Sequence, residues 1–332
     1  MKGKITKVGL AREYRKKYGM EMPTLKLARI MYNENNIMFK DIDDARWSLR
    51  YIEGKVGKQN KNKVAEKQFI MEKARPLNPY NIPESDEIPF NPFIIKGYKR
   101  IGVISDIHLP YHSITALTAA IDFCKKDKID ALLLNGDVLD CFQLSRFVKD
   151  PRKRNFAGEL EQFEELMNIF EKQLKCQMFF KYGNHSERYE AFLFQKAKEL
   201  IGVEEFDLDN IIKSRANGIK IIKDKRIIKV AGLNIIHGHE YTQGVFNPVN
   251  VARGLFLRGK TSAMQSHSHQ TSEHTESDMN GKITTTWSIG CTCSLSPEYS
   301  PLNKWNHGFA IIDTDGKTFD VRNKRIVNGK VL

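Results

Sequence analysis

The chain of 332 residues is 41% hydrophobic and 10% aromatic, and its 53 Lys and Arg against 40 Asp and Glu give a formal charge of +13. This composition excludes a disordered chain and suffices for one large domain and a small one. No stretch approaches the roughly 20 apolar residues of a membrane span, and no secretory leader is recognisable, so we expect a cytoplasmic protein that is not membrane-bound.

Residues 1–75 are predicted to form a basic three-helix domain. They hold 19 Lys and Arg against 9 Asp and Glu, and therefore carry +10 of the total charge. Apolar residues at helical spacing predict helices within 10–19, 23–35 and 41–55. Three short basic helices resemble a helix-turn-helix that binds nucleic acid. A helical module used only for packing or oligomerisation is the alternative.

The next segment, 76–95, is predicted to be a proline-rich linker or strap. It contains five prolines between positions 76 and 93, and proline fixes φ and removes a backbone donor. Residues 96–332 then alternate short apolar runs with helices, which predicts an α/β domain. The predicted elements are strands at 100–105, 130–135, 177–182, 232–238 and 282–290, a helix at 159–175 and a closing hairpin over 308–321.

Residue types that can bind transition metals follow four of these predicted strands. The motifs are ISDIH with Asp106 and His108, NGDVLD with Asp137 and Asp140, GNHSER with Asn184 and His185, and HGHE with His237 and His239. A single histidine after a strand is more often a hydrogen-bonded core residue, but four such motifs in order indicate a site at the strand carboxyl ends. Oxygen and imidazole donors together suit Mn, Fe or Zn better than Ca or Mg.

The ordered set D-x-H, G-D-x-x-D, G-N-H, H-G and H-x-H resembles a calcineurin-like metallophosphoesterase over residues 100 to about 312. The layout is also similar to bacteriophage-encoded members. The resemblance implies a sandwich of two mixed sheets flanked by helices, here with a small N-terminal all-α domain. It further implies two divalent metal ions, for which we expect Mn, with Fe, Zn and Ni as alternatives.

The resemblance also assigns roles to individual residues. The implied metal ligands are Asp106, His108 and His269 for the first ion, Asn184, His237 and His267 for the second, and Asp137 as the bridge. His185 is expected to act as general acid or charge stabiliser, with Asp140 orienting it. Arg146 and Arg188 are candidate phosphate clamps, with surface salt bridges as the alternative.

Three features depart from the family pattern or stand outside it. The family usually has glycine before its last H-x-H, where this chain has Ser266. His239 is a rival ligand to His237, which we favour because it directly follows an apolar strand. Cys291 and Cys293 form the only close cysteine pair, and their spacing is a weak indication of a metal site because it is not CxxC.

The sequence therefore predicts a two-metal phosphoesterase in which a hydroxide bridging the ions attacks a phosphate ester. The basic N-terminal part favours a nuclease acting on nucleic-acid phosphodiesters, and a phosphomonoesterase or phosphoprotein phosphatase is the first alternative. The second alternative is a nucleic-acid-binding protein with an inactive phosphoesterase domain, against which the complete ligand set argues. If the protein is phage-encoded, it would act in the host cell cytoplasm. Oligomeric state is not predicted.

Overall fold

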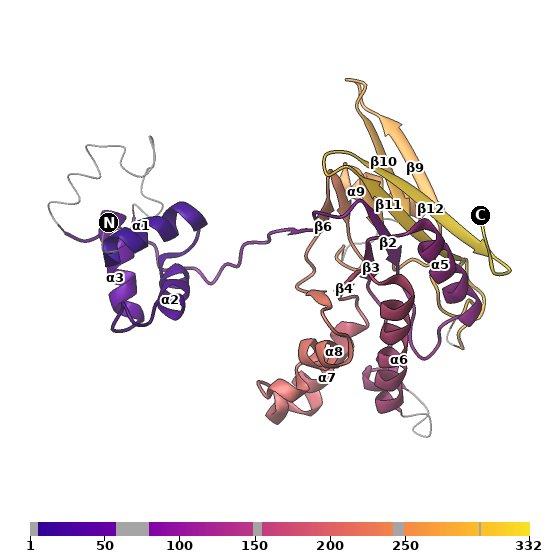
Figure 1. Cartoon of the computed structure of the whole chain (residues 1–332), viewed down its shortest axis with the longest axis horizontal. Helices are drawn as coiled ribbons and strands as arrows, with labels where there is room; N and C mark the ends of the chain where they lie inside the picture. Colours follow the sequence, from indigo (N-terminus) through magenta and orange to yellow (C-terminus); the bar gives the residue numbers. More distant parts are fainter. Residues whose placement is uncertain (1–5, 58–79, 149–154, 242–248, 299) are drawn as a thin grey trace. The chain divides into compact units, whose positions relative to one another are not determined.

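The computed structural model describes residues 6–57, 80–148, 155–241, 249–298 and 300–332, and the chain divides into two units, Met1–Pro89 and Phe90–Leu332 (Figure 1). The parts of the predicted helical domain and linker at 1–5 and 58–79 lie outside the described residues. None of the helices in the described ranges is long and apolar enough to cross a membrane.

The N-terminal unit contains the three predicted helices, which are confirmed as α1 (Lys7–Tyr18), α2 (Thr24–Glu34) and α3 (Ile42–Ile52). Thr6 and Asp41 cap α1 and α3 by accepting backbone N–H bonds. The helices bury one face each, because their apolar residues recur at three- and four-residue spacing. This small core contains Leu10, Ala11, Tyr14, Leu27, Ala28, Met31, Phe39, Ala45, Leu49 and Ile52.

A buried ion pair links α1 to the segment that follows α3 in the N-terminal unit. The guanidinium of Arg15 on α1 donates to the carboxylate of Glu53, which follows α3, and the two side chains are only 3% and 2% exposed. Arg15 also donates to the carbonyl oxygens of Gly19 at 3.1 Å and Met22 at 2.6 Å. Its charge is therefore satisfied by groups that follow α1 and α3 and by the segment before α2.

The second unit contains two mixed β-sheets. The seven-stranded sheet has the order β13-β12-β11-β2-β3-β4-β5, and the six-stranded sheet has the order β1-β6-β7-β8-β10-β9. The strands of the first are β2 (Arg100–Ile104), β3 (Ala131–Asn135), β4 (Gln177–Lys181), β5 (Lys220–Ile222), β11 (His307–Thr314), β12 (Phe319–Val327) and β13 (Lys330–Val331). Those of the second are β1 (Phe93–Ile94), β6 (Ile228–Val230), β7 (Leu233–Ile235), β8 (Ala263–Gln265), β9 (Ser272–Ser277) and β10 (Ile283–Ser288).

Helices cover the outer faces of both sheets. They are α5 (Ile114–Asp127), α6 (Phe156–Leu174), α7 (Ser186–Lys196) and α8 (Leu208–Arg215) on the seven-stranded sheet, and α9 (Val251–Gly259) on the other. Short 3₁₀ turns lie at Phe142–Leu144, Lys198–Leu200 and Glu204–Phe206. Figure 1 shows α5 and α6 running alongside β2 and β3. The predicted sandwich is confirmed, as are the predicted strands and the predicted helix, observed as α6.

Successive side chains along a strand point to opposite faces of the sheet, which explains how one strand packs against both the helices and the second sheet. In β3, Leu132 and Leu134 pack against the helices, whereas Leu133 faces the second sheet. Between the sheets it meets side chains such as Ile235 and Met264. Strands buried on both faces need apolar residues at every position, which is why the sequence shows continuous apolar runs rather than alternation.

Candidate metal centre

The predicted ligands lie where five strands end. Strands β2, β3 and β4 run parallel in one sheet, and β7 and β8 run parallel in the other. Their carboxyl ends lead directly into the segments with the predicted ligands. Five of those ligands have positive φ: Asp106, His108, Asp137, His267 and His269. Left-handed backbone at non-glycine residues is costly and concentrates at functional sites, so the turns are shaped for the side chains they present.

The first cluster gathers Asp106, His108 and His269. His269 Nε2 lies 3.1 Å from Asp106 Oδ1 and 3.3 Å from His108 Nε2. All three side chains are buried. Two imidazole nitrogens that face each other cannot both carry a proton without repulsion, whereas a cation between them satisfies both lone pairs. The donor set therefore fits a divalent transition-metal ion.

The second cluster gathers Asp137, Asn184, His237 and His267. His237 Nε2 lies 3.1 Å from Asp137 Oδ2 and 3.2 Å from Asn184 Oδ1. The ligand atoms of Asp137, His237 and His267 all lie within 4.8 Å of one another. His267 also reaches the first cluster, because its backbone N–H donates to Asp106 Oδ2 at 3.1 Å. The two clusters are therefore contiguous.

Charges within the clusters shift the pKa values in opposite directions. Burial alone would raise the pKa of Asp106 and of Asp137, but the surrounding histidines hold both well below their usual range. Burial would lower the pKa of His237 and of His269, but Asp137 and Asp106 raise each to about 9. Without an ion, protonated imidazoles balance the carboxylates, so metal binding must release protons.

The hydroxyl of Ser266 contacts Nδ1 of His237, on the side of the ring away from the other candidate ligands. His237 Nδ1 is 2.8 Å from the carbonyl oxygen of Asn135 and 3.1 Å from Ser266 Oγ. Asn135 in turn donates to Ser266 Oγ at 2.9 Å. The residue that departs from the family's glycine thus joins a buried hydrogen-bond network that orients His237.

His185, Asp140 and Arg188 form a connected group beside the clusters. His185 Nδ1 lies 3.1 Å from Asp140 Oδ1, and Arg188 donates to that same oxygen at 2.8 Å. A second nitrogen of Arg188 is 2.8 Å from His185 Nε2. Burial would raise the pKa of Asp140, but His108 and His185 lower it, so the carboxylate stays ionised. Arg188 is therefore paired inside the site rather than on the outer surface.

A cavity of about 950 Å³ opens beside the clusters. Asn184 and Arg188 form part of its wall next to the candidate metal ligands. The rest of the lining combines cations and aromatic rings with the carboxylate of Glu187 and with neutral residues. Among these residues are Arg146, Phe147, Phe156, Phe192 and Lys196. The guanidinium of Arg146 lies 5.7 Å from the ring centroid of Phe147.

Sequence reasoning missed a charged pair next to the backbone of His237, the buried Lys181 and the largely buried Glu240. Glu240 accepts the backbone N–H groups of His237 at 2.9 Å and Gly238 at 2.6 Å. Lys181, whose side chain is 1% exposed, lies 3.0 Å from Glu240. A lysine at the end of the apolar run QMFFK was the available signal, because a buried charge needs a partner. The ring centroid of His239 lies 5.3 Å from that of His237, but its Nε2 contacts Glu187 at 3.0 Å.

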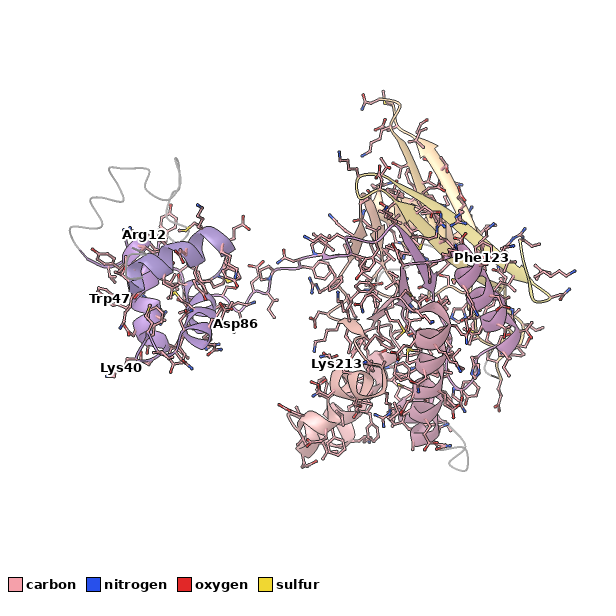
Figure 2. The ribbon with its side chains drawn as sticks, viewed as in Figure 1. Arg12, Lys40, Trp47, Asp86, Phe123 and Lys213 are labelled. Atoms are coloured by element: carbon pink, nitrogen blue, oxygen red, sulfur yellow. The ribbon has the colours of Figure 1, made fainter. Side chains whose placement is uncertain are left out.

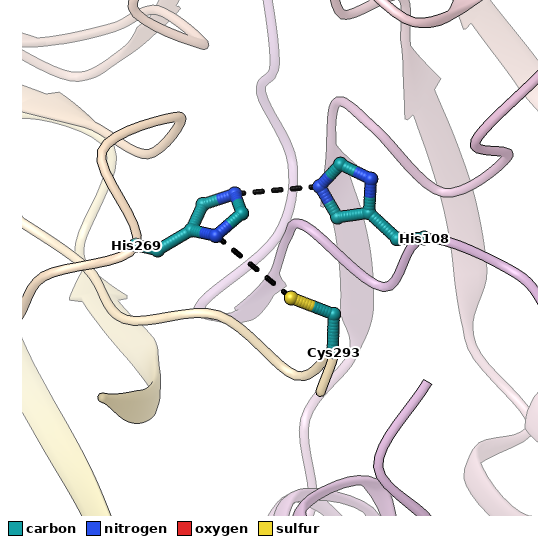
Figure 3. A group of neighbouring side chains, drawn as sticks. All are labelled: His108, His269 and Cys293. Atoms are coloured by element: carbon teal, nitrogen blue, oxygen red, sulfur yellow. Dashed lines mark hydrogen bonds between the residues drawn. The ribbon is translucent and has the colours of Figure 1, made fainter. Parts of the chain in front are cut away.

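The thiol of Cys293 also contacts the site. Its Sγ lies 3.8 Å from His269 Nδ1, on the side of the ring opposite His108 (Figure 3). Atoms of His108, His269 and Cys293 lie within 4.8 Å of one another. The weak signal of the C-x-C pair therefore did point to a residue beside the metal ligands.

This fold, with oxygen and imidazole donors gathered at its strand ends, defines a metal-dependent phosphoric ester hydrolase. The family model described as calcineurin-like phosphoesterase matches residues 99–281, which is more than half of the chain. The chain belongs to the calcineurin-like phosphoesterase family, as predicted. Members of this family depend on two metal ions, and the two clusters supply suitable donors.

Relatives and solved structures match about 70% of the chain. The Gene 54 protein of Mycobacterium phage L5 is 26% identical over 251 residues, 70% of this chain and 95% of that protein. Its counterpart in Mycobacterium phage D29 is 24% identical over 254 residues, with the same shares. These relatives confirm the predicted resemblance to phage-encoded members.

A Vps29 mutant from Entamoeba histolytica is 14% identical with a TM-score of 0.37, covering 70% of this chain and 96% of that one. A dimetal phosphatase from Danio rerio is 9% identical with a TM-score of 0.36, covering 70% and 98%.

Proposed function

We propose that this phosphoesterase is a nuclease that hydrolyses nucleic-acid phosphodiesters. The observation that carries the proposal is the cavity beside the two clusters, because it combines cations with aromatic rings. Guanidinium and ammonium groups match phosphate oxygens, and aromatic rings stack on bases. At about 950 Å³ the cavity has room for a nucleotide.

We propose that Asp106, His108 and His269 hold one ion and that Asp137 bridges to the other. The second ion would be held by Asn184, His237 and His267. The donors suit Mn, our first choice, with Fe, Zn and Ni as alternatives. Two such ions, when bound, lower the pKa of a water and clamp the phosphoryl oxygens.

His185 is the proposed general acid, and Asp140 is its orienting partner. The carboxylate accepts the Nδ1 proton, which leaves Nε2 on the side of Asp137, 3.8 Å from its Oδ2. Arg188 now donates to Nε2 at 2.8 Å. A substrate phosphate would give this guanidinium another acceptor, so that Nε2 could take up a proton from solvent and then donate it to the leaving group. Arg188 and Arg146 would thus act as phosphate clamps.

The basic N-terminal part is proposed to bind nucleic acid through phosphates rather than bases. Within 6–57 there are 11 Lys and Arg against 7 Asp and Glu, a net +4, so most of the +10 of residues 1–75 lies outside the described residues. Asp41, Asp43 and Asp44 crowd the start of α3, which disfavours placing that end in a DNA groove. Figure 2 labels Arg12, Lys40 and Trp47 on this unit, and all three are exposed.

The phage relatives support the host cell cytoplasm as the place of action. There the chain would meet nucleic acid directly, which is consistent with the proposed substrate class.

The proposal is tested by assaying Mn-loaded protein on single- and double-stranded DNA, on RNA and on p-nitrophenyl phosphate. We expect polynucleotide cleavage that Arg146→Ala reduces more than it reduces hydrolysis of the small ester. The matched control is Lys213→Ala, an exposed cation on α8 (Figure 2). Hydrolysis of the small ester with intact polynucleotides would reject the nuclease in favour of a phosphomonoesterase. Two bound ions without any hydrolysis would favour a nucleic-acid-binding protein with an inactive domain.

A further inference from the structure

We propose that Cys293 is a positioning residue for His269, holding that imidazole so that its Nε2 faces the metal. Sγ of Cys293 lies 3.8 Å from His269 Nδ1, while Asp106 Oδ1 and His108 Nε2 lie 3.1 Å and 3.3 Å from Nε2. The thiol and the other ligands therefore contact opposite nitrogens of one ring (Figure 3). This inference concerns metal binding and does not depend on the nature of the substrate.

A comparison with the other imidazoles of the site supports this role. His237 has its Nδ1 2.8 Å from the carbonyl oxygen of Asn135, and His108 has its Nδ1 3.4 Å from Asp140 Oδ2. A neutral imidazole can offer only one nitrogen to a metal, so a partner for the other nitrogen selects the tautomer and fixes the ring. At His269 the contact on Nδ1 is a thiol, where the other two histidines have oxygen.

The thiol is itself held in place. Cys293 is 3% exposed, and its carbonyl oxygen accepts from His307 Nε2 at 2.8 Å. The preceding residue, Thr292, donates its backbone N–H to the carbonyl oxygen of Asp106 at 3.2 Å. The segment that presents the sulfur is thus bonded to the loop that presents a metal ligand, and the two cannot shift independently.

Trp305, Cys291 and the main chain of Asn306 also contact His269. Its centroid lies 4.1 Å from that of the Trp305 ring, and its backbone carbonyl accepts from Asn306 at 2.9 Å. These contacts restrict the His269 backbone and one side of the ring, and the thiol of Cys293 would restrict rotation of the imidazole. The sulfur of Cys293 lies 3.8 Å from Nδ1 of His269. In Cys293→Ser the shorter C–O bond would leave the oxygen farther from Nδ1, and Cys293→Ala would leave a gap.

The test compares Cys293→Ala and Cys293→Ser with Cys124→Ala, which removes an equally buried thiol from the core on the helix side of the seven-stranded sheet. Affinity for Mn²⁺ is measured by competition with a chelator, without substrate. Loss of an outer partner of a ligating histidine typically costs about 10- to 100-fold in metal affinity. We expect a loss of this size for one of the two ions in Cys293→Ala, a smaller loss in Cys293→Ser, and none in Cys124→Ala.

Two spectroscopic readouts separate positioning from other roles. In metal-free protein, ¹⁵N NMR should show that Cys293→Ala mobilises the His269 ring, while Cys124→Ala does not. In cobalt-loaded protein, a thiolate-to-cobalt charge-transfer band that disappears in Cys293→Ala would show that the sulfur is a direct ligand and would overturn the proposal. Unchanged Mn²⁺ affinity in folded Cys293→Ala would also overturn it. If Cys293→Ala does not fold, the same comparison in Cys293→Ser decides.

Discussion

His185 and Asp140 are joined by a contact of 3.1 Å between Nδ1 and Oδ1, and Arg188 donates to the same carboxylate oxygen. Because Asp140 also faces His108 Nδ1 at 3.4 Å, one buried carboxylate serves both a candidate metal ligand and the candidate general acid. His185 is therefore connected to the proposed metal centre through Asp140, although it is not itself assigned as a ligand.

Replacing His185 should impair chemistry without removing the ions. A positioned acid or base typically contributes about 10²- to 10⁴-fold, so we expect His185→Ala to lower kcat by a factor in that range. The metal content by elemental analysis should stay that of the parent protein. His274→Ala, which removes a histidine on β9, should keep full activity. An unchanged kcat in His185→Ala would exclude the assigned role.

Gly183 should be required for metal binding because of the space that its missing side chain leaves. A Cβ at this position would lie 2.1 Å from Asp137 Oδ1 and 2.7 Å from the Asp137 backbone nitrogen. We therefore expect Gly183→Ala to displace Asp137 and to lower Mn²⁺ affinity at least tenfold in calorimetric titrations. Gly232→Ala is the control, since its Cβ would meet Phe319 at 3.4 Å. Equal affinity in the two variants would contradict the bridging position of Asp137.

Glu159 should make the fold less stable as the pH rises. Burial raises the pKa of this carboxyl to about 8, although it accepts the Cys141 N–H at 2.8 Å. An unfolded glutamate releases its proton near pH 4.5, so between about 4.5 and 8 the folded state holds a proton that the unfolded state has lost. Stability then falls with rising pH across this window, by about 5 kcal/mol at most.

Glu159→Gln keeps an oxygen for the Cys141 N–H but cannot ionise. We expect its melting temperature to exceed that of the parent by a margin that grows from pH 4.5 to 8, measured by scanning calorimetry. Glu165→Gln, an exposed position on the same helix, should leave the pH profile unchanged. Parallel profiles for Glu159→Gln and the parent would mean that Glu159 is ionised in the folded protein.

Removing one partner of the Arg15–Glu53 pair should destabilise the N-terminal unit. An unpaired buried charge typically costs about 3–5 kcal/mol of folding free energy. We therefore expect Glu53→Ala to abolish slow exchange of the backbone amides in α1–α3, while the amides of the second unit stay protected. Arg46→Ala breaks the exposed pair with Glu84 and should cost less than about 1 kcal/mol. Equal protection in Glu53→Ala and Arg46→Ala would show that the buried pair does not hold the unit together.

The sequence by itself was sufficient for the family, the sandwich and the approximate position of each candidate ligand. Apolar runs follow from strands buried on both faces, and each candidate ligand stands within a few residues of a strand end. Both signals are local in the chain, so they can be read without knowing how the sheets pack. The three N-terminal helices were predictable for the same reason, because their apolar spacing and end residues are local as well.

Only the tertiary structure decided how the candidate ligands are supported. Asn135 and His237 are about a hundred positions apart, and the hydroxyl of Ser266 joins them from a third strand end. The contacts of Lys181 with Glu240 and of His269 with Cys293 likewise join separate strand ends. Such hydrogen bonds depend on distances that are set when the two sheets pack on each other, and no local pattern in the sequence encodes those distances.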